Sequence, residues 1–343
     1  MSTCVHCDTD VLTLVRPAKP MQLVGCSQCH NPLLLQWDDT AKPQVLHGPG
    51  MDRVEDVSPR GSVIEGIFSI LSDVISELPV LAEVPQRVVT AVHDPLSSMD
   101  DIAVIIEDDA VLSMKVLSLA NSAYFATISE INDLSTACSR LGMRALANIA
   151  YAVANANLYK TNDPMAREVM QQLWCHAVAT AHSAEAIGRK VGLDQNTSFI
   201  GGLVHDIGKA VLLDAITTKY TGNVGRLRES RELLVSVLDQ HAPLVGLHVV
   251  QYWKLAPEFS FSTLYSQQPD QVPDEQWEKL TYTISLASIM ADHCGYAIGD
   301  GDPASFDSAI YQESLGFSSE DIEELKTDLE DSLEAIVGVL SSM

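Results

Sequence analysis

Positive charge is scarce in this sequence. The 343 residues include 21 lysines and arginines against 46 aspartates and glutamates, a formal net charge of −25. So strong a negative field repels phosphate backbones and anionic lipid headgroups. We therefore expect neither nucleic acid nor a membrane as a partner. Two explanations of this charge are equally good. It serves solubility or adaptation to a salty cytoplasm, or it serves to bind a basic protein partner.

Long apolar runs, a secretory leader and the common nucleophile and phosphate-binding motifs are also missing. No apolar run reaches the ~18 residues of a bilayer-spanning helix, and no charged, apolar and small-residue leader opens the chain. The sequence contains no Gly-x-Ser-x-Gly elbow, no Gly-x-Gly-x-x-Gly loop and no Walker loop. These absences predict a cytoplasmic protein without a serine-hydrolase or P-loop site.

Four of the seven cysteines form two Cys-x-x-Cys pairs near the start of the sequence. Cys4 and Cys7 are separated from Cys26 and Cys29 by 18 residues. Four thiolates at this spacing are typical of a closed tetrahedral zinc site. A pair of disulfides is the first alternative, which the missing secretory signal disfavours. A redox Cys-x-x-Cys is the second, and no strand–helix–strand pattern surrounds either pair.

The residues between and after the two cysteine pairs have the pattern of a small β structure. Residues 11–15 and 21–24 read as two strands about a proline-containing turn, and residues 33–35 as a third strand. We therefore predict that residues 1–37 form a zinc ribbon. Because all four thiolates would be ligands, the zinc would be structural.

The rest of the chain is predicted to be helical. Residues 38–63 are rich in proline, glycine and charge and read as a linker. Amphipathic segments with short breaks then predict a helical bundle over residues 64–300, so the fold class is mainly α with a small β module in front. Residues 301–343 form an acidic helical segment. Its apolar stripe, which either the bundle or a second copy must cover, consists of Ile322, Leu325, Leu329, Leu333, Ile336 and Leu340.

The adjacent pair His205 and Asp206 carries the clearest chemical signal of the sequence. An imidazole and a carboxylate near a helix end can bind one divalent ion if other helices add a histidine and a carboxylate. His176 is the candidate histidine because it lies on or beside the apolar stripe of the preceding helix; a hydrogen-bonded core histidine is the alternative. Asp292 is either a fourth ligand or a solvated helix residue, and we expect it to be solvated.

Several segments, taken in order, resemble the HDOD domain, the HD-related output domain of bacterial signalling proteins. These segments run from about residue 78 to residue 295 and are Leu78–Leu81, Asp100–Asp109, Lys115–Phe125, Ala137–Gly142, Leu173–His176, Gly202–Gly208 and His241–Trp253. The resemblance implies a helical bundle and an output role in bacterial signal transduction.

The sequence departs from the wider HD phosphohydrolase pattern at two places. Those enzymes share a His…His-Asp…Asp set whose last aspartate follows Leu-Ala, whereas here Leu-Ala is followed by Ser288. Asp292 lies four residues later, about 5–6 Å along a helix, which is too far to substitute without a register shift. Many relatives also have a His-His pair where this chain has Tyr265 and Ser266. The resemblance therefore implies an incomplete site, and we expect no second divalent metal there.

We interpret the chain as a non-catalytic regulatory module that acts by protein–protein interaction and has no catalytic residue. Its degenerate metal site, here called the HD pocket, consists of His176, His205, Asp206, Lys209, Ser288 and Asp292. Two alternatives stay open. The first is a metal-dependent phosphohydrolase of a nucleotide or cyclic dinucleotide, with Lys209 on the phosphate and a displaced Asp292 as ligand. The second is a small-molecule sensor that uses the HD pocket. The sequence does not specify the partner, the signal or whether a homo-oligomer forms.

Overall fold

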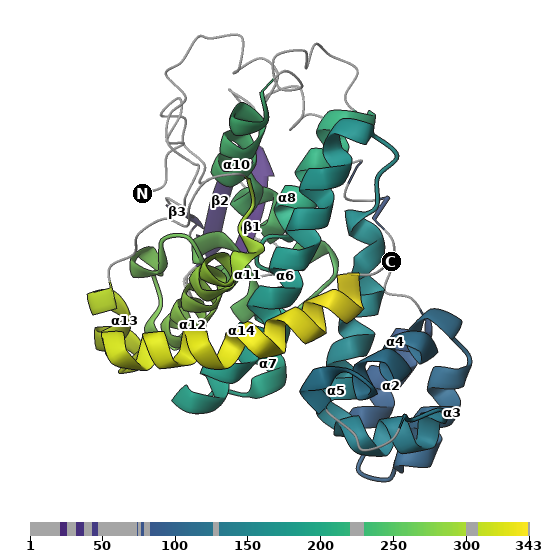
Figure 1. The fold of residues 1–343 in the computed structure, drawn as a ribbon. Helices are drawn as coiled ribbons and strands as arrows, with labels where there is room; N and C mark the ends of the chain where they lie inside the picture. Colours follow the sequence, from purple (N-terminus) through teal and green to yellow (C-terminus); the bar gives the residue numbers. More distant parts are fainter. Residues whose placement is uncertain are drawn as a thin grey trace.

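The described part of the protein is mainly helical (Figure 1). The structure is a computed structural model and describes residues 83–125, 130–219, 230–299 and 308–341, with a few residues between 74 and 78 and three strands between 21 and 46. The predicted helical class is confirmed for the main domain.

Three short strands precede the helices. They are β1 (Met21–Gly25), β2 (Pro32–Trp37) and β3 (Pro43–Leu46) and form an antiparallel sheet in that order. β1 and β2 coincide with two of the predicted strands. β3 lies inside the segment predicted as a linker, because an edge strand tolerates the proline that the prediction took as a break. Cys4, Cys7, Cys26 and Cys29 lie outside the described residues, so the zinc ribbon stays a prediction.

A first group of helices packs around one long helix. The group consists of α2 (Glu83–His93), α3 (Met99–Glu107), α4 (Ala110–Ala120), the short turn η1 (Ala123–Phe125) and α5 (Leu134–Ala156). α5 contacts α2, α3 and α4. α3 begins at a capping box, in which Ser98 Oγ accepts from the Asp101 N–H and the Ser98 N–H donates to Asp101 Oδ2 at 2.9 Å. The helix therefore begins at Met99, directly after its capping serine.

A second, larger group is built on α6. It consists of α6 (Pro164–Val191), α7 (Gln195–Val204), α8 (Ile207–Asp214), α10 (Arg231–Tyr252), α11 (Pro257–Tyr265), α12 (Glu275–Ala291) and the short turns η2 (Asn157–Tyr159), η3 (Ala215–Lys219), η4 (Pro269–Gln271) and η5 (Asp292–Tyr296). α6 contacts α7, α8 and α12 and ends at Gly192, whose φ of 77° is left-handed. Glycine adopts this conformation readily, which explains why the helix ends there.

By length and composition, one helix in the described part of the chain, α10, could cross a membrane. Of its most apolar 18-residue window, 67% is buried within the described fold. α10 packs against α8 and α11. Its apolar composition therefore matches that of a helix in the core of the domain.

The acidic end of the chain folds back onto both groups of helices. α13 (Ser308–Leu315) leads into α14 (Ser319–Ser341), which runs along α6 and reaches α4 (yellow in Figure 1). All six residues of the predicted stripe on α14 are buried. The last turn is held by Lys115 Nζ, 2.5 Å from the Val339 carbonyl oxygen, and by Trp174 Nε1, 3.3 Å from that of Leu340. The domain itself thus covers the stripe.

Candidate functional site

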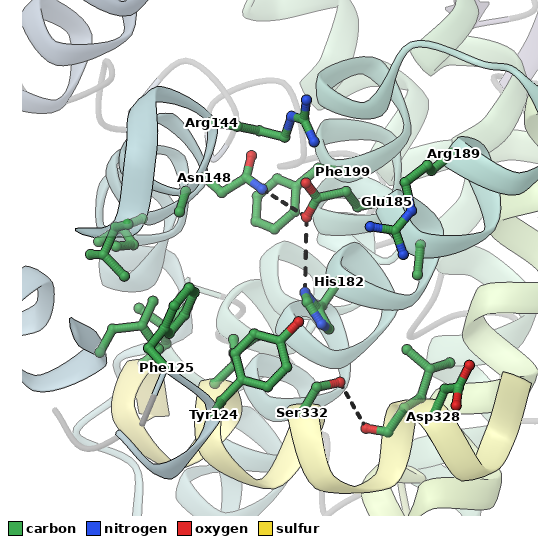
Figure 2. Close-up of a pocket in the computed structure, with 18 of the residues that line it drawn as sticks. Tyr124, Phe125, Arg144, Asn148, His182, Glu185, Arg189, Phe199, Asp328 and Ser332 are labelled. Atoms are coloured by element: carbon green, nitrogen blue, oxygen red, sulfur yellow. Dashed lines mark hydrogen bonds and ion pairs between the residues drawn. The ribbon is translucent and has the colours of Figure 1, made fainter. Parts of the chain in front are cut away.

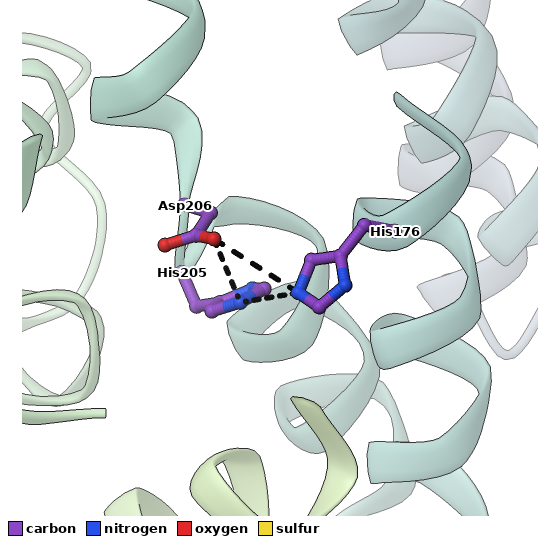
Figure 3. Close-up of side chains that lie close together, drawn as sticks. All are labelled: His176, His205 and Asp206. Atoms are coloured by element: carbon purple, nitrogen blue, oxygen red, sulfur yellow. Dashed lines mark hydrogen bonds and ion pairs between the residues drawn. The ribbon is translucent and has the colours of Figure 1, made fainter. Parts of the chain in front are cut away.

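Three side chains predicted from separate motifs meet in the interior of the second group. His176 comes from α6, while His205 and Asp206 form the junction between α7 and α8 (Figure 3). The Nε2 atoms of the two histidines are 3.3 Å apart. Asp206 Oδ2 lies 3.5 Å from His205 Nε2 and 3.9 Å from His176 Nε2. All three side chains are buried. The spacing argument that placed His176 opposite the His-Asp pair is therefore confirmed.

Two glycines allow the helices to approach closely at this junction. A Cβ added to Gly202 would lie 2.7 Å from the Cα of Ala181, and one added to Gly208 would lie 2.0 Å from the carbonyl oxygen of Ala242. Both obstacles are backbone atoms, so a side chain would force the helices apart. Gly202 thus brings α7 onto α6 beside His176, and Gly208 brings α8 onto α10.

Outer hydrogen bonds fix the orientation of both imidazoles. His205 Nδ1 lies 2.7 Å from the Gly202 carbonyl oxygen. His176 Nδ1 lies 3.1 Å from the Tyr296 carbonyl oxygen and 3.2 Å from Asp292 Oδ1. Since oxygen acceptors surround each Nδ1, each Nδ1 carries a proton and both Nε2 atoms face inward. Two facing lone pairs at 3.3 Å repel unless a proton or a cation lies between them.

The two histidines differ in basicity. Burial alone would lower the pKa of His176, but the hydrogen bond and charge of Asp292, with the charge of Asp206, raise it above its ordinary value. Burial lowers the pKa of His205 to about 4. A proton held on His176 Nε2 can therefore be donated to the lone pair of His205 Nε2. A proton shared between the two Nε2 atoms therefore explains their separation of 3.3 Å without a metal ion.

The fourth position of the site carries a hydroxyl, as the sequence predicts. Ser288 Oγ lies 3.2 Å from His176 Nε2, on the side that faces His205, and Thr180 Oγ1 lies 3.3 Å from the same nitrogen. Asp292 does not replace the missing carboxylate, because it contacts the opposite nitrogen of His176. The expectation that Asp292 is simply solvated is also wrong. The helix continues into the π-helical turn η5 at this residue, and its partly exposed carboxylate holds the His176 ring.

An ammonium group pairs with the same oxygen of Asp206 that faces the two histidines. Lys209 Nζ is 2.7 Å from Asp206 Oδ2 and 2.8 Å from Asp239 Oδ1 of α10. Burial would raise the pKa of Asp206, yet Lys209 and the two histidines hold that pKa well below its usual value. Burial would lower the pKa of Lys209, and the two carboxylates raise it. Both partners are therefore charged. Asp239 was missed from the sequence, where nothing distinguishes it from Glu232, the other acidic residue of its helix.

The residues of the HD pocket do not fit a complete HD-type metal site. The three ligand atoms lie 3.3, 3.5 and 3.9 Å from one another, close enough for one ion at about 2.0–2.2 Å from each. However, Asp206 Oδ2 is already paired with the Lys209 ammonium, and Ser288 contributes a neutral hydroxyl. Two imidazoles and one neutralised carboxylate bind a divalent ion weakly compared with the two histidines and two aspartates of the HD pattern.

Solved structures share this fold. A candidate metal-dependent phosphohydrolase from Shewanella amazonensis matches with a TM-score of 0.60 and 24% identity, over 82% of this chain and 98% of that chain. An HDOD domain protein of unknown function from Geobacter sulfurreducens matches with a TM-score of 0.59 and 20% identity, over the same shares. A candidate signal transduction protein from Marinobacter aquaeolei matches with a TM-score of 0.57 and 20% identity, over 84% of this chain and 67% of that chain. At these identities the likeness concerns the fold alone.

Sequence comparison identifies the family. An uncharacterized protein from Treponema pallidum is 27% identical over 228 residues, which is 64% of this chain and 43% of that relative, so the chain spans less than half of its length. The sequence model of the HDOD domain matches residues 78–269, more than half of the chain, and this range includes His176, His205 and Asp206. The chain belongs to the HDOD family.

Proposed function

We propose that the protein is a regulatory module of bacterial signal transduction, which acts through contacts with other proteins and catalyses no reaction at the HD pocket. One observation carries the proposal: the Ser288 hydroxyl lies 3.2 Å from His176 Nε2, where a fourth ligand would have to be a carboxylate. The Lys209 ammonium on Asp206 supports it, because a fixed internal cation replaces the charge that a metal ion would supply.

In this proposal the HD pocket is a buried polar cluster that connects helices of the domain. Lys209 connects α8 to Asp239 of α10, and His176 connects α6 to the turn after α12. Hydrogen-bonded buried charges of this kind define one arrangement of the helices. The rigid bundle would then present a surface that binds protein partners in the cytoplasm. The net charge of −25 favours protein partners over nucleic acid or an anionic membrane.

We also propose that Cys4, Cys7, Cys26 and Cys29 hold one structural zinc ion. The support is their spacing in the sequence, together with the antiparallel pairing of β1 and β2, which flank the second Cys-x-x-Cys. Since a closed thiolate site leaves no open coordination position, the zinc would stabilise this module and take no part in hydrolysis.

One observation favours the rival candidate, a metal-dependent phosphohydrolase of a nucleotide or cyclic dinucleotide. The inward Nε2 atoms of His176 and His205 converge on one point with Asp206 Oδ2. This arrangement is also what a metal ion requires. In the rival, Lys209 would contact a substrate phosphate, but two carboxylates already engage its ammonium. A sensor that uses the same pocket is less well supported, because the three side chains contact one another and are buried.

Hydrolysis assays separate the two candidates. With manganese, iron or magnesium, the purified full chain should hydrolyse neither nitrophenyl phosphate esters nor a cyclic dinucleotide above the rate of buffer alone. His205→Ala should leave that background rate unchanged and lower the melting temperature instead, because His205 is buried and hydrogen-bonded. Metal-dependent turnover that disappears in His205→Ala would establish the rival.

A further inference from the structure

A second cavity lies on a different face of α6 from the HD pocket. It has a volume of about 270 Å³ and is lined mainly by the turn η1, α5, α6, Phe199 of α7 and the C-terminal helix α14 (Figure 2). None of the residues of the HD pocket lines it. Its walls combine apolar side chains, Phe125, Phe199 and Leu329 among them, with polar and charged ones. Small-molecule sites commonly combine an apolar surface with polar groups that fix the orientation of the ligand.

A hydrogen-bonded pair of polar side chains forms part of the cavity wall. Asn148 Nδ2 donates to Glu185 Oε2 at 3.0 Å, and this bond fixes the amide because the carboxylate accepts. Asn148 Oδ1 has no hydrogen-bond partner, but it is buried within the wall and does not face the cavity. The charges of Arg144 and Arg189 act on the Glu185 carboxylate and counter the rise in its pKa that burial causes.

The opening of the cavity is basic in an otherwise acidic protein. Arg144, Arg189 and Lys190 line it and are exposed, whereas the carboxylates that line it are Glu185 and Asp328. Arg144 is held by a hydrogen bond to Gln195 of α7. Three cations against two carboxylates leave this cavity with a small positive excess in a protein whose formal net charge is −25, and this excess favours an anionic ligand.

Aromatic rings line the cavity beside these cations. Tyr124 and Phe125 pack edge to face, and the His182 ring packs against Tyr124 in the same way. Burial, with the nearby charge of Arg189, lowers the pKa of His182 to about 4, so its ring is neutral at neutral pH. Flat ligand rings prefer such surroundings, because ring edges and faces attract one another.

We propose that this cavity binds a small organic anion that has an aromatic body. The aromatic body lies between Phe125, Phe199 and Leu329. The anionic group meets Arg144 and Arg189. Because α5 and α14 supply opposite walls, the ligand strengthens the attachment of the acidic C-terminal helix to the first group of helices. The site is independent of the HD pocket, so it stands whether or not that pocket is catalytic.

Anilinonaphthalene sulfonate is a suitable probe, because it combines a sulfonate and two aromatic systems. Its fluorescence, titrated into the full chain, should show one saturable site. Arg189→Glu should weaken binding on the order of tenfold, as expected for the loss of one charged contact. Ala186→Phe, which fills the cavity from α6, should abolish the signal of this site. The matched control is Arg167→Glu, an exposed arginine of the same helix outside the cavity, which should change the affinity by less than about twofold.

Two results would overturn the assignment. The first is the absence of saturable binding to the unaltered chain at millimolar dye. The second is an affinity pattern that does not depend on the cavity. Equal affinity of the unaltered chain, Arg189→Glu and Ala186→Phe would place the dye on another surface. An equal loss of affinity in Arg189→Glu and Arg167→Glu would show that only the overall charge of the protein matters. Circular dichroism checks that each variant is folded. Should Ala186→Phe not fold, Arg189→Glu against Arg167→Glu decides, because both side chains are exposed.

Discussion

Replacing Leu325 and Leu329 together by aspartate should detach α14 and destabilise the whole helical domain. The two side chains are 1% and 2% exposed and lie on the face of α14 that packs against α6. Truncation of a buried leucine costs about 2–5 kcal/mol, so the pair loses at least about 4 kcal/mol before the cost of the buried carboxylates is added. At roughly 2–4 °C per kcal/mol for a domain of this size, the melting temperature should fall by about 10 °C or more. Thermal unfolding followed by circular dichroism measures this.

The matched control reverses two exposed charges of the same helix. Glu324→Lys with Asp328→Lys changes exposed residues and should shift the free energy of unfolding by less than about 0.5 kcal/mol per site. The account of α14 as an integral part of the fold fails if the aspartate pair melts at the temperature of the unaltered chain. Because the domain itself covers the stripe, the mass of the molecule in solution should not depend on these leucines.

The second large effect is expected from Lys209→Met. This change removes the cation but leaves Asp206 buried beside two histidines and facing Asp239. Breaking a buried ion pair from one side costs about 3–5 kcal/mol, since an uncompensated charge remains. Lys160→Met is the control, because Lys160 is exposed. Urea unfolding of both variants should show the loss in Lys209→Met alone.

A double variant tests whether the loss comes from the unpaired carboxylate. Lys209→Met with Asp206→Asn removes both charges, so it should recover much of the stability lost in the single variant. If the single variant unfolds at the same urea concentration as the unaltered chain, Lys209 does not form the buried cation of this site. If the double variant is as unstable as the sum of the two single variants, the two side chains are not coupled.

Periodicity and motif order were sufficient to predict the three central residues of the HD pocket. His176 falls on a helical stripe, and His205-Asp206 ends a glycine-rich helix, so pattern alone placed them in one groove. The departure at Ser288 was visible only by comparison with the HD phosphohydrolase pattern that the sequence resembles. These features depend on residues close together in the sequence, and such local patterns are what a single sequence reports.

The partners that orient these residues could not be predicted. Asp239 reaches Lys209 from a different helix, and the Tyr296 carbonyl reaches His176 only because η5 is a π-helical turn. The second cavity was missed for the same reason. Asn148, Glu185 and Leu329 come from three helices, and no motif joins them. Contacts of this kind depend on the packing of helices far apart in the sequence.

The metal content of the purified chain tests the central claim, that the HD pocket is not a metal site. After incubation with zinc and manganese and removal of free ions, the unaltered chain should retain about one zinc and no manganese. Cys26→Ser with Cys29→Ser should lose that zinc, as expected for a closed thiolate site, and His205→Ala should keep it. A second metal ion per chain that is lost in His205→Ala and kept in the cysteine variant would contradict the account.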